Sequence, residues 1–133
     1  MQNVIKFLFM REKPRDKARL QHILQAIDNI NKFKEGVDYN EFESNKILFY
    51  AIVKNVEMVG EAAYMLSKDF KSSHPEQPWI DIEGMRHVLV HDYYNISVFR
   101  VWDTINSDMI SLRQSVVQYL QELPDEDING NII

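Results

Sequence analysis

The segment "WDTINSDMISLRQSVVQYLQEL", residues 102–123, carries apolar residues in steps of three and four, as one face of an α-helix requires. These residues are Trp102, Ile105, Met109, Leu112, Val116, Tyr119 and Leu123. A stripe of this kind fits either the core of a helical bundle or a seam between two chains. We predict a bundle core, in a helix that Ser97 caps and Pro124 ends.

Three further segments carry helical patterns. The first opens at Pro14 and stops at Gly36, with apolar residues at helical spacing in Leu20, Ile23, Leu24, Ile27 and Ile30. The second runs from about Glu41 to Lys68, and the third from about Trp79 to His91. Residues 71–79, "KSSHPEQPW", are expected to form a loop or a single turn. No alternating β pattern interrupts them, so the sequence predicts an all-α fold, an antiparallel bundle of four main helices.

The length of 133 residues indicates one domain. We expect a helical domain at residues 11–123, an N-terminal extension at 1–10 and a flexible acidic tail at 124–133. The opening "MQNVIKFLFM" is short and is followed by charged residues, which predicts neither a signal peptide nor a membrane span. The absence of cysteine excludes disulfides and thiolate metal sites, and we expect a cytoplasmic protein.

The net charge of −5 argues against nucleic-acid binding driven by the overall field. Basic residues nevertheless gather near the N-terminus, at Lys6, Arg11, Lys13, Arg15, Lys17 and Arg19. This run can be ordinary solvated surface, or it can offset the acidic balance locally if it lies beside a binding cleft.

Residues 85–94, "MRHVLVHDYY", place an Arg, two His, an Asp and two Tyr among apolar residues. One interpretation is the solvated side of an amphipathic helix. A second is a metal site, because Glu83, His87 and His91 are four residues apart and share a helical face. The other histidines, His22 and His74, supply no further ligand at a recognisable spacing, so the metal site is the least favoured interpretation.

The third interpretation is metal-free acid–base chemistry on a phosphodiester. The Arg86 guanidinium matches phosphate oxygens, and an imidazole such as that of His91 can take or give a proton near neutral pH. On an ideal helix these residues are separated by roughly 140°, so either the helix ends near His91 or a second chain supplies the missing groups. Tyr93 falls within roughly 20° of the Arg86 face if the helix persists that far.

The spacing Arg86-x4-His91-x-Tyr93 resembles the R-x4-H-x-Y motif of the HEPN superfamily, and more narrowly the HepT-like ribonuclease toxins. The surrounding sequence agrees. "KPRD" opens the first helix, "GEAA" stands at 60–63, and "PWIDIEGMRHVLVHDYYNI" leads to "VW" at 101–102. The resemblance covers residues 11–123.

This resemblance implies an all-α homodimer with the motif in a cleft at the interface. It implies that Arg86 and His91 cleave RNA without a metal or other cofactor. It also implies a partner, a nucleotidyltransferase antitoxin of the minimal (MNT) type, which transfers AMP to Tyr93. An AMP group there adds negative charge and bulk beside the two ribonuclease residues.

Two positions qualify this expectation. Many relatives have Asn after the motif Arg, whereas this chain has His87, which can act as a second acid or be merely exposed. Glu61 in "GEAA" can orient Arg86 or remain an exposed helix residue. The alternative function is a non-catalytic HEPN module that binds a nucleotide or a protein partner, which the acidic composition favours.

Overall fold

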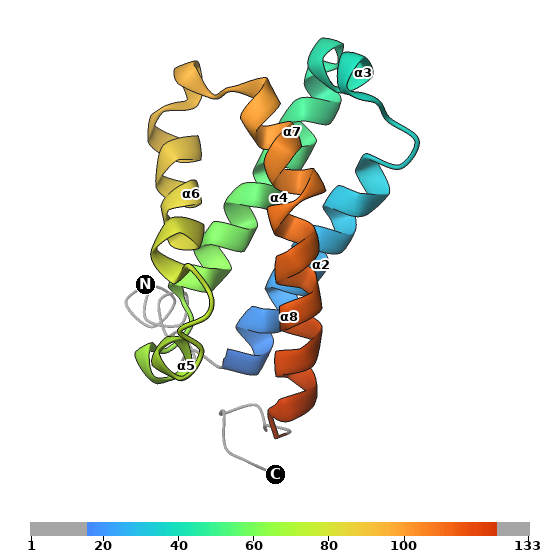
Figure 1. Ribbon diagram of the computed structural model, residues 1–133. Helices are drawn as coiled ribbons and strands as arrows, with labels where there is room; N and C mark the ends of the chain where they lie inside the picture. Colours follow the sequence, from blue (N-terminus) through green and yellow to red (C-terminus); the bar gives the residue numbers. More distant parts are fainter. Residues whose placement is uncertain (1–15, 125–133) are drawn as a thin grey trace, which may run out of the picture.

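The computed structural model describes residues 16–124, which are α-helical apart from connections and one 3-10 turn. Four helical segments follow one another in alternating directions (Figure 1). They are α2 (Asp16–Phe33), α4 (Lys46–Tyr64), α6 (Trp79–His91) and the consecutive pair α7 (Val98–Asn106) and α8 (Asp108–Glu122). The predicted all-α fold is confirmed. The N-terminal extension, most of the basic run and residues 125–133 of the acidic tail lie outside the described residues.

The core lies between α2, α4 and α8. Helix α2 packs along α4 on one side and against α8 on the other. The predicted apolar faces are buried, and the stripe of residues 102–123 is a core rather than a seam between chains. Its buried members are Ile105, Met109, Leu112, Val116 and Tyr119, while Trp102 and Leu123 at its two ends are partly buried. Burying each such side chain stabilises the fold by about 1.5–3 kcal/mol.

The second predicted helix is divided at Asn45. A short helix, α3 (Tyr39–Ser44), precedes α4, and Asn45 ends the first and caps the second by accepting a hydrogen bond from the backbone N–H of Leu48. At the other end α4 stops at Tyr64, and Ser67 caps α5 (Lys68–Ser73), which occupies part of the predicted loop. The prediction of one helix over 41–68 is therefore wrong at both ends.

The last predicted helix is also divided, at Ser107. The side chains of Asn106 and Ser107 bond back to the carbonyl oxygens of Trp102 and Asp103, at 2.8 and 2.6 Å, and such bonds compete with the helical ladder. The apolar stripe continues through the break, which is why the sequence pattern does not reveal it. The predicted cap at Ser97 is confirmed, with its hydroxyl accepting from the backbone N–H of Arg100.

Helix α6 stands at the edge of the bundle. It packs extensively against α4, and the 3-10 turn η1 (Tyr93–Asn95) follows it directly. Figure 1 shows α6 set apart from α7 and α8. Within residues 16–124 no helix is long and apolar enough to span a bilayer. Because α6 packs mainly against α4, most of its surface is exposed to solvent.

Candidate active site

The backbones of α4 and α6 touch where Gly60 faces Arg86. A Cβ atom added to Gly60 would lie 2.9 Å from the backbone N of Arg86 and 3.1 Å from both the Arg86 Cβ and the carbonyl oxygen of Ile82. Any larger residue would have to push the helices apart. Gly60 therefore sets the position of Arg86 relative to α4, a role signalled in the sequence only by a glycine within a helical pattern.

Replacing Gly60 with alanine is expected to lower the free energy of unfolding by about 1–3 kcal/mol, because the added methyl group meets backbone atoms. Gly84→Ala is the matched control, since Gly84 lies within α6 and a Cβ there meets nothing within 4 Å. That control is expected to be neutral or to stabilise by up to about 1 kcal/mol. Denaturant unfolding of both variants measures the difference, and equal stability would refute the close contact.

The side chain of Arg86 is held from α4. Its Nε forms an ion pair with Oε2 of Glu61, the residue after Gly60, and the two side chains are 45% and 47% exposed. The ion pair involves Nε, whereas a guanidinium offers five N–H donors in all, four of them on its two terminal nitrogens. The structure thus brings together Glu61 and Arg86, as the sequence suggested.

His91 is the last residue of α6, and its side chain is exposed. The helix therefore ends at His91, one of the two arrangements that the sequence allowed. The ring of His87, one turn earlier, lies with its centroid 4.6 Å from that of His91 at an interplanar angle of 44°. Two imidazoles are consequently side by side on the solvent side of the helix end.

Tyr93 lies beyond the helix, in η1, so the condition for its sharing a helical face with Arg86 is not met. Its ring packs on that of Tyr94, with centroids 4.1 Å apart, and both side chains are exposed. The side-chain hydrogen bond with Tyr94, and next the loss of hydration, raise the pKa of the Tyr93 phenol. The Tyr93 hydroxyl is therefore protonated at neutral pH and open to solvent.

The structure does not join Arg86 to His91 within one chain. Arg86 is drawn toward α4 by Glu61, whereas His91 lies at the exposed end of α6. In the described part of the chain no hydrogen bond or ion pair links the two side chains. The end of the helix at His91 therefore does not by itself bring the two side chains together. The other arrangement, in which a second chain supplies the missing groups, is taken up as a proposal below.

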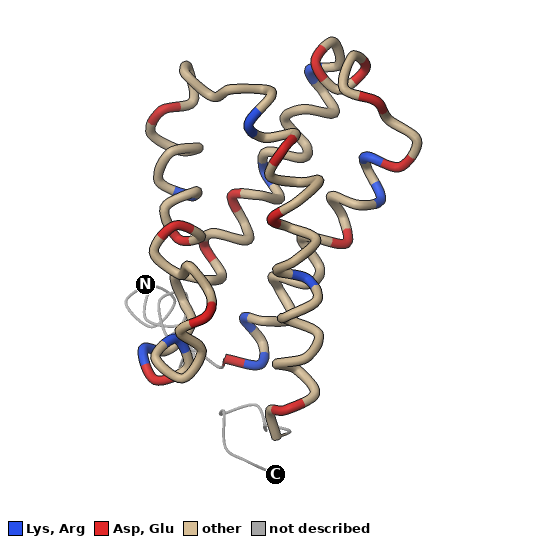
Figure 2. Tube along the Cα trace, in the orientation of Figure 1, with Lys and Arg blue, Asp and Glu red and all other residues tan. Residues whose placement is uncertain are grey.

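The suggested metal ligands are engaged differently. Glu83 forms an ion pair with Lys71 of α5, and the rings of His87 and His91 pack against each other. Among residues 16–124 no three His, Asp or Glu side chains converge as a metal site would require. Figure 2 shows Lys and Arg dispersed among Asp and Glu along the trace.

Comparison with known proteins places the chain in a family. Residues 23–119 match the family model described as ribonuclease HepT-like. "Putative RNase MJ1380" of Methanocaldococcus jannaschii is 33% identical over 100 residues, which is 75% of this chain and 92% of that protein. "Putative RNase TTE0752" of Caldanaerobacter subterraneus subsp. tengcongensis is 33% identical over 103 residues, 77% of this chain and 92% of the relative.

"Probable ribonuclease HepT" of Thermococcus cleftensis is 34% identical over 97 residues, covering 73% of this chain and 88% of that protein. No solved structure matches the chain. The family model matches well over half of the chain, and the chain covers most of each of these relatives. The class is that of HepT-like proteins, and this all-α chain carries Arg86, His91 and Tyr93 at the end of its third main helix. The protein belongs to the HepT-like ribonuclease family.

Proposed function

We propose that the protein is a metal-independent endoribonuclease toxin that acts as a homodimer. The proposal rests on the position of the motif. His91 is exposed at the end of the helix that also contains Arg86, and Arg86 forms an ion pair with Glu61. The relatives' names as ribonucleases support the reaction class.

The reaction is transfer of the RNA phosphoryl group to the neighbouring 2′-oxygen. A neutral imidazole of His91 takes the proton from the 2′-hydroxyl, whose oxygen attacks phosphorus while the bond to the 5′-oxygen breaks. A second imidazole, which is protonated, gives a proton to the 5′-oxygen as it leaves. Arg86 stabilises the negative charge that builds on the phosphoryl oxygens. The products are a cyclic 2′,3′-phosphate and a free 5′-hydroxyl, with no metal in the reaction.

In a dimer, Arg86 of one subunit can act together with His91 of the other, although the two residues of a single chain do not meet. A twofold axis near the end of α6 brings two copies of the motif together, so that Arg86 of one subunit can meet His91 of the other. The large apolar side chain of Val90, which is 40% exposed on α6, supports such an interface. Tyr94 adds an exposed aromatic ring beside the motif.

Glu61 acts in this proposal as a positioning residue. By forming an ion pair with Nε of Arg86, Glu61 would orient the guanidinium so that the terminal nitrogens can bind a phosphate in the bidentate manner. The role of His87 is that of a second imidazole able to replace or assist His91, given the 4.6 Å separation of their ring centroids.

Control of the toxin is assigned to Tyr93. An MNT-type nucleotidyltransferase would join the phenolic oxygen to the α-phosphorus of ATP, releasing pyrophosphate and the phenolic proton. The phenol is protonated at neutral pH, so the transfer needs a base that removes this proton, and the raised pKa of Tyr93 strengthens that need. The bound adenylate would then compete with RNA phosphate for Arg86.

Production of the protein together with such a transferase is expected to add the mass of one or more adenylates, measured on the intact chain. Tyr93→Phe should abolish the addition, because it removes the accepting hydroxyl, while leaving RNA cleavage in place. Tyr94→Phe is the matched control and should still be modified. Modification of Tyr93→Phe, or loss of modification from Tyr94→Phe alone, would assign the acceptor to another residue.

The ribonuclease itself is tested by incubating purified protein with RNA in EDTA. Cleavage in EDTA supports the proposal, whereas cleavage only after metal is added would favour the metal enzyme. Retention of RNA or nucleotide binding without cleavage would favour the non-catalytic module. Sedimentation of the same sample determines whether the active species is a dimer.

A further inference from the structure

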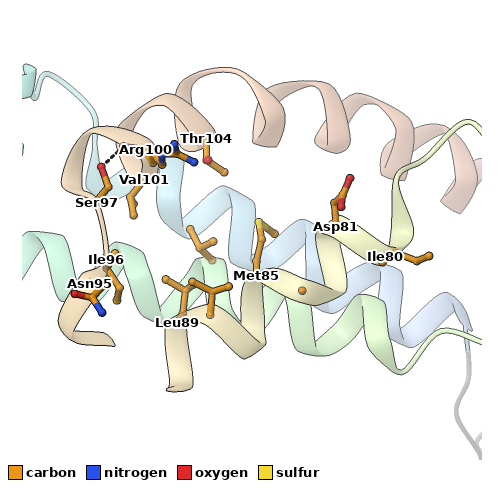
Figure 3. A pocket seen from close by; sticks show the side chains of 13 residues that line it. Ile80, Asp81, Met85, Leu89, Asn95, Ile96, Ser97, Arg100, Val101 and Thr104 are labelled. Carbon is orange, nitrogen blue, oxygen red and sulfur yellow. Dashed lines mark hydrogen bonds between the residues drawn. The ribbon is translucent and has the colours of Figure 1, made fainter. Parts of the chain in front are cut away.

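A groove runs between α6 and α7, on a side of α6 that does not include Arg86, His87 or His91. One end of the groove is lined by Asn95 of η1, the turn that also contains Tyr93. The volume of the groove is about 580 Å³, the size of a small-molecule site, and Val56 of α4 is among the residues that line it. Figure 3 shows Met85 and Leu89 of α6 on one wall and Val101 and Thr104 of α7 on the other. The groove is continuous with a smaller one of about 300 Å³ between α6 and α8, since Asp81, Met85 and Thr104 line both.

The two ends of the groove differ in charge. Arg100 of α7 lines one end together with Asn95 and Ser97, which follow Tyr93 closely in the chain. Within residues 16–124 no carboxylate pairs with the exposed Arg100 guanidinium, in contrast to Arg86 and Arg113, which pair with Glu61 and Asp28. Asp81 lies toward the other end (Figure 3). A free cation thus marks the end nearest the motif, and a carboxylate marks the far end.

We infer that this groove binds one nucleotide of the RNA strand beside the scissile linkage, an inference that rests on the proposed ribonuclease function. The apolar walls formed by Met85, Leu89 and Val101 would cover the nucleobase. Arg100 would bind the phosphate that joins this nucleotide to the one held at the motif. The Asp81 carboxylate would repel phosphate and accept hydrogen bonds from a base amino group, which fixes the direction of the strand.

Charge complementarity selects RNA over the other occupants of an apolar groove. An apolar helix or a second subunit would fill the walls but would leave an unpaired guanidinium under the contact. A nucleotide matches both features, because its base is flat and apolar on its faces while its phosphate is anionic. The position also fits, because Asn95, which lines the cationic end of the groove, belongs to the same 3-10 turn as Tyr93.

The test uses a mixed-sequence 2′-O-methyl RNA oligonucleotide, which lacks the attacking hydroxyl and cannot be cleaved. Fluorescence anisotropy measures its affinity for the full chain over a series of salt concentrations. Arg100→Gln is expected to weaken binding about tenfold and to lower the slope of log affinity against log salt by about 0.7, the value for one phosphate of a single strand. Arg113→Gln removes the same charge away from the groove and should change neither quantity.

A second variant tests the apolar walls. The chain contains no cysteine, so Thr104→Cys introduces a single thiol into the groove. Labelling that thiol with a bulky maleimide is expected to weaken RNA binding at least tenfold relative to the same variant without the label, because the label occupies the space assigned to the base.

The outcomes separate this inference from the proposed function. If the wild type cleaves RNA and Arg100→Gln binds the oligonucleotide as Arg113→Gln does, the groove assignment is wrong and the ribonuclease stands. If Arg100→Gln instead converts dimer to monomer in sedimentation, the groove is a subunit contact and the assignment is also wrong. If the wild type neither binds nor cleaves RNA, the groove assignment and the proposed ribonuclease function are both wrong.

Discussion

His91→Ala is expected to slow RNA cleavage by about 10²–10⁴-fold while leaving RNA binding intact. The expected size is that of removing one general acid or base from a reaction that needs both. The side chain is exposed at the end of α6, so its loss should not affect folding. Single-turnover cleavage in EDTA, followed by gel, measures the chemical step directly.

His87→Ala is the matched control, because it removes the neighbouring imidazole, whose ring centroid lies 4.6 Å away. A loss much smaller than that of His91→Ala assigns the acid–base role to His91. A loss of equal size would mean that the two imidazoles share the role. Undiminished cleavage by the double variant would remove histidine from the mechanism.

Arg86→Ala is expected to reduce cleavage by about 10²–10³-fold, the usual effect of deleting one group that stabilises charge in a transition state. Arg86→Lys should restore little activity, because an ammonium cannot pair with Glu61 through one nitrogen while offering two parallel donors to phosphate. The Arg86–Glu61 pair is nearly half exposed, so its removal should alter stability only slightly. Thermal unfolding of each variant checks this point.

Glu61→Gln separates positioning from charge stabilisation. The amide oxygen can still accept from Nε of Arg86, so the guanidinium should stay oriented and most activity should remain. Glu61→Ala removes the acceptor and should lose more activity than Glu61→Gln, with the larger change in the cleavage rate rather than in RNA affinity. Equal activity of Glu61→Ala and wild type would show that Arg86 needs no support from α4.

The helical segments could be predicted from the sequence because their apolar residues follow the helical period closely. The positions of Ile23, Ile27 and Ile30, and of the stripe from Ile105 to Tyr119, correspond to buried faces in the structure. The breaks at Asn45 and Ser107 could not be predicted in this way, because the apolar pattern continues across both and only local side-chain bonds interrupt the ladder.

The candidate site could be predicted only in part. The end of α6 at His91 agrees with the sequence pattern, and the suggested contact of Glu61 with Arg86 is present. The backbone contact at Gly60 and the groove beside Arg100 depend on how closely two helices approach and on which neighbours they lack. Those quantities belong to the arrangement of the helices in space, and no single segment of sequence carries them.

The attachment of α6 along one side has a consequence for how the protein tolerates change. The α2–α4–α8 core holds most of the buried apolar side chains, while α6 contributes few to it. Substitutions on the outer surface of α6 should therefore change the rate of RNA cleavage with little effect on the stability of the fold. The surface proposed to cleave RNA can therefore be altered by substitution without disturbing the α2–α4–α8 core beneath it.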